Sequence, residues 1–146
     1  MSLTLSVKIK PKDLAKMMKQ EKADIKRSID RAIGLTAAKG KDIILTRTKK
    51  GVGVNGSFKP YSEGYVTYRK NVLKKVSPSL VNLNATGEMV RNVQSRTKTS
   101  RIAEIYFSNR NAAEKAAFND RTRPFFSVNG GEEDKLQKVF VREFFK

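Results

Sequence analysis

The stretch KADIKRSIDRAIGLTAAKGKDIILT, residues 22–46, decides the fold class predicted for this chain. Apolar and small residues recur in it every three or four positions, as on one face of a helix, namely at Ile25, Ile29, Ala32, Ile33, Thr36, Ala37, Gly40, Ile43 and Ile44. The basic residues lie largely off this stripe, as on a solvated face: Lys22, Lys26, Arg27, Arg31, Lys39 and Lys41. Gly34 and Gly40 weaken a helix locally, but their small size permits close packing against a sheet. The stretch therefore predicts one long amphipathic helix over residues 22–46.

Strand patterns lie on both sides of this helix. Residues 3–9 alternate strictly, with apolar side chains at every second position, which is typical of a half-buried strand. Residues 93–98 and 101–108 have the pattern of an antiparallel pair, and their better core face carries Ala103, Ile105 and Phe107. The predicted fold is α+β: a small, mostly antiparallel sheet packed by the long amphipathic helix and a C-terminal helix, with a long projecting loop.

Shorter helices complete the predicted architecture. Pro11 opens a short helix with Leu14, Met17 and Met18 on its apolar side. Further helices are expected over 63–75, near Gly87, over 112–118 and over 132–145, the last with Leu136, Val139, Phe140, Glu143 and Phe144 at helical spacing. A length of 146 residues suits a single domain, 1–146, with a flexible arm at about 50–65.

The composition argues against several kinds of chemistry. The chain has no Cys and no His, so it offers no disulfide, thiolate metal site, Cys nucleophile or imidazole base. The acidic run Glu132-Glu133-Asp134 suits the first turn of a helix better than a Mg²⁺ site, because no other acid is placed to join it. We therefore expect no enzyme, no catalytic residue, no cofactor and no metal.

The net charge of +17 is unevenly distributed. Residues 1–50 carry 14 Lys and Arg against five acids, residues 51–100 carry eight against two, and residues 101–146 carry nine against seven. Such a surface attracts nucleic acid or acidic proteins, and charge alone does not choose between them. The chain has no apolar run long enough to span a membrane, and its start, MSLTLSVKIK, does not resemble a signal peptide, so we expect a soluble, cytosolic protein without membrane contact.

The segment GVGVNGSFKPYSEGYVTYRK, residues 51–70, predicts a long irregular connection, which inside a compact domain is usually functional or disordered. Its tyrosines, Tyr61, Tyr65 and Tyr68, are interleaved with Lys59, Arg69 and Lys70. This arrangement could stack on nucleic-acid bases. The alternative is that the tyrosines anchor a loop on the core, with their hydroxyls in water.

Short motifs in a fixed order support a family resemblance. Asn55-Gly56-Ser57-Phe58-Lys59-Pro60-Tyr61-Ser62 follows the long helix, then Leu83-Asn84-Ala85-Thr86-Gly87-Glu88-Met89, two strands, an Ala-rich helix, Arg123-Pro124-Phe125-Phe126 and a final helix. Over residues 25–146 this order resembles the tail-completion, or virion-morphogenesis, proteins of tailed bacteriophages and prophages. The chain departs from that family ahead of Arg123, where it has neither His nor Gly, and a turn built on Asn119 and Asp120 is expected instead.

The resemblance implies a structural protein of the phage neck, assembled in the host cytoplasm and located in the virion at the head–tail junction. It implies a ring-shaped homo-oligomer that contacts the connector and the tail-tube or terminator proteins, with weak non-specific contact to DNA. The other candidate function is a non-specific nucleic-acid-binding protein, which the charge alone would also suit.

The resemblance also assigns roles to residues. Phe58, Lys59, Tyr61, Tyr65, Tyr68 and Lys70 would form an arm that gains order on a neighbouring subunit. Thr86 and Gly87 would form a structural turn in which Thr86 caps a short helix. Arg123 is expected to pair with an acid, either within the chain or across a subunit boundary, and the pairing within the chain is favoured because most such pairs are local. Pro124 extends the backbone so that Phe125 or Phe126 can fill the core.

Overall fold

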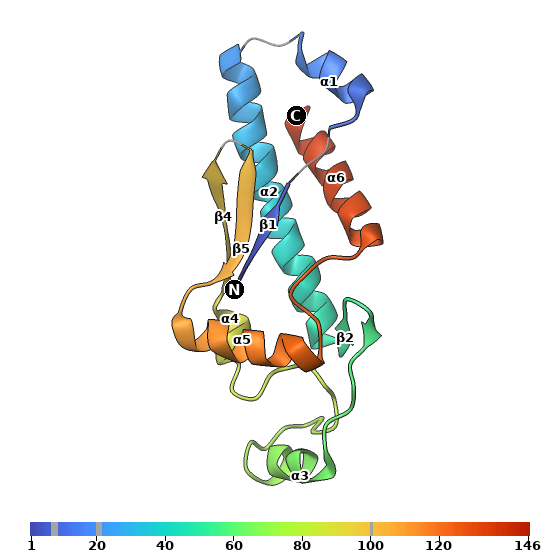
Figure 1. The fold of residues 1–146 in the computed structure, drawn as a ribbon, viewed down its shortest axis with the longest axis vertical. Coiled ribbons are helices and arrows are strands. Elements are labelled where there is room, and N and C mark those ends of the chain that lie inside the picture. Colours follow the sequence, from blue (N-terminus) through green and yellow to red (C-terminus); the bar gives the residue numbers. More distant parts are fainter. Residues whose placement is uncertain (7–8, 20–21, 100) are drawn as a thin grey trace.

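The computed structural model describes residues 1–6, 9–19, 22–99 and 101–146. The elements follow one another as β1 (Ser2–Leu5), α1 (Pro11–Met17), α2 (Lys22–Lys49), β2 (Val52–Gly53), β3 (Gly56–Ser57), α3 (Glu63–Asn71), α4 (Glu88–Arg91), β4 (Val93–Thr99), β5 (Ile102–Phe107), α5 (Arg110–Thr122) and α6 (Gly130–Phe144). The molecule is elongated, with α1 and the C-terminus towards one end and α3 at the other (Figure 1). The predicted α+β class is confirmed.

The main sheet has three antiparallel strands in the order β1-β5-β4, so the last strand in the sequence is the central one. The predicted strand pair is confirmed: Ala103, Ile105 and Phe107 of β5 are all buried on the face that meets the core. The strand predicted over residues 3–9 is described as β1 only up to Leu5. Residues 7 and 8 lie outside the described residues.

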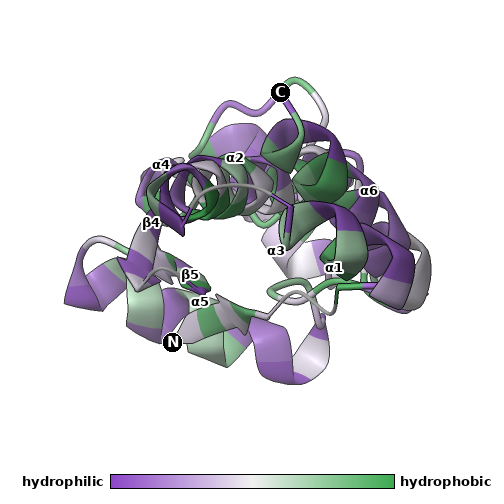
Figure 2. Ribbon diagram, turned by 90° about the horizontal axis from the view of Figure 1, so that it is seen from above, coloured by the Kyte–Doolittle hydropathy of each residue, from purple (hydrophilic) through white to green (hydrophobic). Residues whose placement is uncertain are grey.

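Helix α2 crosses the sheet and packs along α6, which confirms the predicted long helix and extends it to Lys49. Its buried face is the predicted stripe, and seen along the molecule α2 and α6 turn hydrophobic residues towards each other (Figure 2). At Gly40 an added Cβ would lie 3.1 Å from Ile105 Cδ1 and 3.3 Å from Leu5 Cδ1, so the small residue allows close packing on the sheet, as predicted. Among the described residues, no helix combines the length and apolarity needed to cross a lipid bilayer.

The short helix α1 begins at Pro11, as predicted, but its apolar side is only partly covered. Met17 is buried, whereas Leu14 and Met18 are exposed. Met17 joins one of two core clusters along α2, together with Phe140 and Phe144 of α6. Of the predicted apolar side, α1 therefore packs through Met17 and leaves Leu14 and Met18 exposed.

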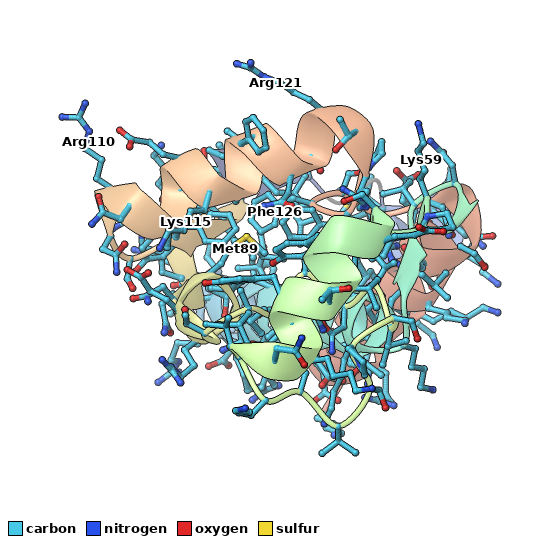
Figure 3. The ribbon with its side chains drawn as sticks, turned by 90° about the horizontal axis from the view of Figure 1, so that it is seen from below. Lys59, Met89, Arg110, Lys115, Arg121 and Phe126 are labelled. Carbon is cyan, nitrogen blue, oxygen red and sulfur yellow. The ribbon has the colours of Figure 1, made fainter. Side chains whose placement is uncertain are left out.

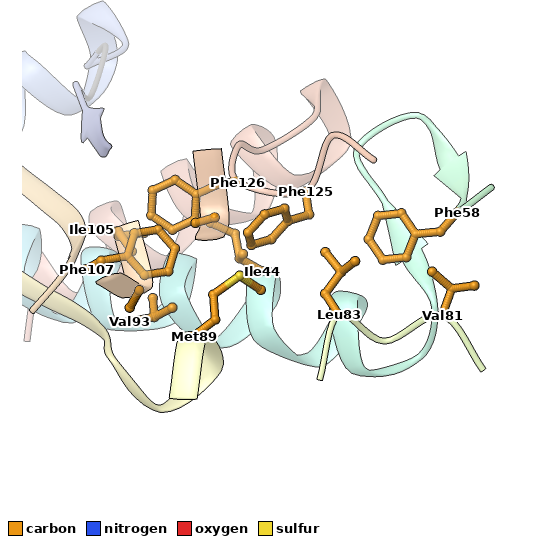
Figure 4. Close-up of a cluster of buried hydrophobic side chains, with 12 residues drawn as sticks. Ile44, Phe58, Val81, Leu83, Met89, Val93, Ile105, Phe107, Phe125 and Phe126 are labelled. Carbon is orange, nitrogen blue, oxygen red and sulfur yellow. The ribbon is translucent and has the colours of Figure 1, made fainter. Parts of the chain in front are cut away.

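The second core cluster lies nearer α3. Figure 4 shows Ile105, Phe107, Phe126 and Phe125 followed by Leu83, Phe58 and Val81. Phe125 and Phe126 are buried, which confirms that the segment after Pro124 fills the core. Helix α5 is longer than the predicted 112–118. Asn119 and Asp120 lie inside α5, so the turn expected on them is wrong. The side-chain carboxylate of Asp120 instead accepts hydrogen bonds from the backbone N–H groups of Phe125 and Phe126 at 2.8 and 3.0 Å and holds the segment that follows the helix.

One carboxylate is buried on the opposite side of β5. Glu104 is 4 % exposed and lies opposite Arg96 of β4. Arg96 Nε donates to Glu104 Oε1 at 2.9 Å, and Lys98 Nζ lies 3.4 Å from Glu104 Oε2. The hydrogen bonds from Arg96, followed by those from Lys98, lower the pKa of Glu104, although its burial acts in the opposite direction.

This lowered pKa makes acid stability depend on Glu104. The stabilisation is fully present above the pKa of a Glu in the unfolded chain, about 4.3, and is lost as the pH falls through the lower folded pKa. We expect the urea midpoint to fall less in Glu104→Gln than in the wild type when the pH is lowered from 7 to 2, and the difference to arise below about pH 4. The control is Glu133→Gln, at an exposed carboxylate without an ion pair among the described residues. Equal acid dependence in both variants would contradict this role of Glu104.

Candidate functional site

The helix predicted from Glu63 is confirmed as α3, whereas the stretch before it, predicted to be irregular, contains the short hairpin of β2 and β3. Strands β2 and β3 pair, Phe58 N–H donates to Gly51 O at 2.9 Å, and Val54 N–H donates to Pro124 O at 2.9 Å. Phe58 is 9 % exposed and belongs to the core, so it is a buried anchor and not part of an exposed arm. Two-residue strands are too short to show an alternating pattern, which is why the sequence did not reveal the hairpin.

Gly53 allows the hairpin to touch the Arg123-Pro124 segment. An added Cβ at Gly53 would lie 2.4 Å from Pro124 O and 2.6 Å from Phe58 Cε1, far inside van der Waals contact. We expect Gly53→Ala to lower the free energy of unfolding by about 1–3 kcal/mol, as overpacking does, measured by urea denaturation. The matched control is Gly64→Ala in the first turn of α3, where an added Cβ meets nothing within 4 Å. Equal effects of the two substitutions would contradict the predicted clash.

Helix α3 and the chain that follows it, residues 61–84, form a projecting unit (Figure 1). From here on we use the name arm for this unit, in place of the segment at about 50–65 for which the sequence predicted an arm. Ser62 caps α3, since its Oγ accepts from Tyr65 N–H at 3.4 Å. The helix ends at Asn71 and not at the predicted residue 75. Three residues later Lys74 has a positive φ of 51°, so the backbone there has left the helix.

Arg69 is the centre of the arm and is 1 % exposed. Its guanidinium donates to backbone oxygens of Pro78 at 2.8 Å and of Leu80 and Asn84 at 3.3 Å each. It also donates to Asn82 Oδ1 at 3.3 Å and to Tyr61 Oη at 3.5 Å. No carboxylate pairs with Arg69 among the described residues. These oxygens solvate its charge and gather the loop after α3 around it.

The tyrosines cover this guanidinium. The Arg69 guanidinium carbon lies 4.8 Å from the ring centre of Tyr61 and 5.9 Å from that of Tyr65, within cation–π range. The Tyr61 hydroxyl also accepts from Leu83 N–H at 3.2 Å, and burial raises its pKa against the opposing charge of Arg69. The hydroxyl of Tyr61 therefore lies inside the arm and not in water. Tyr68 stacks on Tyr65 with ring centres 6.0 Å apart and is exposed.

Arg123 joins the arm to the main body. It donates through Nε to Lys59 O at 3.0 Å and through Nη2 to Pro60 O at 3.1 Å, and its guanidinium carbon lies 5.0 Å from the Tyr61 ring centre. The expected pairing of Arg123 with an acid of the same chain is wrong for the described residues, because backbone carbonyls accept from its Nε and Nη2 and the ring of Tyr61 lies against its guanidinium.

The turn before α4 forms at the predicted place with a different cap. The helix begins at Glu88, and Gly87 takes the cap position with a φ of 83°, a conformation that favours glycine. Thr86 lies one residue earlier, and its Oγ1 accepts from Glu88 N–H at 3.5 Å. Thr86 thus supports the helix start without being the cap residue.

The arm, this turn and α5 enclose a groove of about 560 Å³, which we call the arm groove. Five of the residues singled out from the sequence line it: Tyr61, Tyr65, Thr86, Gly87 and Arg123. The other predicted residues lie outside the groove. Lys59, Tyr68 and Lys70 are exposed, and Phe58 and Phe125 are buried in the core. Pro124 has an exposed side chain, and its carbonyl oxygen faces Gly53 of the hairpin.

Sequence reasoning missed two side chains of the groove wall on α5. Phe118 is 71 % exposed, and Lys115 forms an ion pair with Glu88 of α4 (Figure 3). The helix buries Ala112 and Ala116, four residues apart, and Phe118 lies off that stripe. A large aromatic residue off the buried stripe was the signal that could have identified this wall.

Acidic residues are not gathered for metal binding in the described part of the chain. Glu132 pairs with Arg47 of α2, and its carboxylate also accepts from Asn129 N–H at 2.9 Å in the capping box that starts α6. The first-turn role expected for the run 132–134 is therefore confirmed at Glu132.

Comparison of the chain with protein-family models, curated proteins and solved structures finds no match.

Proposed function

We propose that this chain is a structural protein of a phage or prophage virion, of the neck or tail-completion type, which acts at the head–tail junction. The single observation that carries the proposal is the convergence of the motif residues. Tyr61 and Tyr65, Thr86 and Gly87, and Arg123 come from three separate segments and line one groove. Motifs that serve one interface would be expected to bring their residues together at one surface in this way.

The proposed mechanism is the formation of interfaces. The arm projects from one end of the molecule and is organised internally by Arg69, so it would dock as a folded unit (Figure 1). This revises the expectation of an arm that gains order on binding. Assembly into a ring with connector and tail proteins as neighbours, and location in the virion, belong to the same proposal.

A second candidate function, non-specific nucleic-acid binding, is favoured by the net charge of +17. The arm argues against base stacking as its mechanism. Arg69 is buried, and Arg69 and Arg123 both lie over the ring of Tyr61. Binding to phosphates by exposed lysines would remain available.

Deletion of the coding sequence from the phage or prophage that carries it tests the proposal. We expect heads and tails that fail to join, or tails that remain incomplete, in negative-stain electron micrographs, with normal particles restored by the gene in trans. Normal virions from the deletion strain would refute a neck role.

Light scattering with and without short duplex DNA, at about 50 and 200 mM salt, separates the two functions. A defined complex that survives the higher salt would favour the nucleic-acid function. A mass unaffected by DNA at the higher salt would favour the neck function.

A further inference from the structure

Phe118 is the most exposed aromatic side chain among the described residues, and it lies at the arm groove. Leu83 and Met89 supply buried apolar side chains to the same groove, and Tyr61 and Tyr65 line it from the arm. A volume of about 560 Å³ is within the range of sites that hold a ligand group. The groove can therefore accept an apolar side chain, which would also cover Phe118.

The charge around the groove is positive once internal pairs are removed. Glu88 is paired with Lys115, and Glu114 with Arg110. Asp120 accepts from backbone N–H groups of Phe125 and Phe126 and keeps its negative charge. Glu63, in the first turn of α3, remains as an exposed acid on the arm.

Several cations near the groove have no carboxylate partner among the described residues, among them Lys59, Arg91, Arg121 and Arg123. Arg123 lines the groove, whereas Lys59 and Arg121 lie outside its lining and point outward from the molecule (Figure 3). A groove with an apolar interior and Arg123 in its wall, on a chain of net charge +17, is complementary to an apolar group flanked by carboxylates.

We propose that the arm groove binds an acidic polypeptide segment of a partner protein, with one aromatic or long aliphatic side chain inserted beside Phe118 and flanking carboxylates at Lys59, Arg121 and Arg123. The inference rests on the proposed function, because it names the chemistry of the partner that the neck protein would contact. Nucleic acid is a poorer occupant, because the ring of Tyr61 is covered and the floor is aliphatic.

The test is an NMR titration of the ¹⁵N-labelled full chain with short synthetic peptides. The probe is the peptide DEDFDED, and its matched peptides are DEDADED, without the aromatic anchor, and KRKFKRK, with reversed charge. We expect DEDFDED to shift the amides of residues 83–89 and 115–123, and the two matched peptides to bind about tenfold or more weakly.

Variants assign the binding to the groove. Phe118→Ala is expected to weaken DEDFDED binding about tenfold without changing Tm, because the side chain is largely exposed. The double variant Lys59→Glu and Arg121→Glu should weaken it similarly. The matched control is Lys12→Glu with Lys26→Glu, which changes the net charge equally at exposed positions of α1 and α2 and should leave the affinity within about twofold.

Several results would overturn the proposal: no binding of DEDFDED, equal binding of DEDADED, shifts outside the groove, or an unchanged affinity in Phe118→Ala. Tighter binding of the oligonucleotide (dT)₁₂ at the same amides would assign the groove to nucleic acid. Concentration-dependent self-association through these amides would assign it to a second copy. If DEDFDED does not bind but the deletion strain shows joining defects, only the acidic peptide as occupant of the groove is rejected. If DEDFDED binds but the deletion strain makes normal virions, only the neck function is rejected.

Discussion

Arg69→Ala is expected to unfold the arm while the core formed by α2 and the main sheet stays folded. The substitution removes the donors to three backbone oxygens, Asn82 Oδ1 and Tyr61 Oη, and opens a cavity beneath the tyrosine rings. Buried acceptors that lose a charged donor cost about 1–3 kcal/mol each, so the loss exceeds the stability available to a unit of this size. Hydrogen exchange measured by mass spectrometry should become at least about a hundredfold faster over residues 61–84.

Two variants sharpen this test. Arg69→Lys keeps the charge but replaces the planar fork by a compact ammonium, so it should restore little of the protection. Lys70→Ala, at the exposed neighbouring position, should leave exchange unchanged. If Arg69→Ala left the protection of residues 61–84 intact, the arm would be held by the packing of its Val81 and Leu83 in the core cluster with Phe58, and Arg69 would not be its centre.

Arg47→Leu is expected to destabilise the whole domain by about 3–5 kcal/mol, because it leaves the Glu132 carboxylate buried and unpaired. Arg47 lies near the end of α2, pairs with Glu132 and donates to Phe125 O at 2.7 Å and Ser127 O at 2.8 Å. It thus joins α2, the segment after Pro124 and the start of α6. The measurement is urea denaturation followed by far-ultraviolet circular dichroism.

The same element offers the control for Arg47. Lys49→Leu, at an exposed position in the last turn of α2, should change the free energy of unfolding by no more than about 0.5 kcal/mol. Adding Glu132→Gln to Arg47→Leu should recover part of the loss, because no buried carboxylate then lacks a partner. A loss below about 1 kcal/mol in Arg47→Leu would show that the contacts of Arg47 are replaced by water.

The three buried or half-buried arginines explain much of what sequence reasoning missed. Arg47, Arg69 and Arg123 all bind backbone carbonyls, and every residue contributes a carbonyl whatever its side chain. The partners therefore leave no pattern in the sequence. An arginine that stands in the sequence among tyrosines and lysines is expected at the surface, yet Arg69 is the least exposed of the tyrosines and basic residues of the segment 59–70.

The sequence by itself determined the elements whose signal is periodic and local: the long helix α2, the pair β4 and β5, the final helix α6 and the core role of Phe125 and Phe126. A helix or strand face is set by residues a few positions apart, so its pattern is present before any packing occurs. Only the tertiary structure decided that the segment after α2 is a hairpin with Phe58 in the core, that Arg69 is buried, and that Phe118 meets Tyr61 and Arg123 at one groove. These outcomes depend on contacts between segments far apart in the chain, such as Gly53 with Pro124, and the short stretches that form them carry no periodic signal.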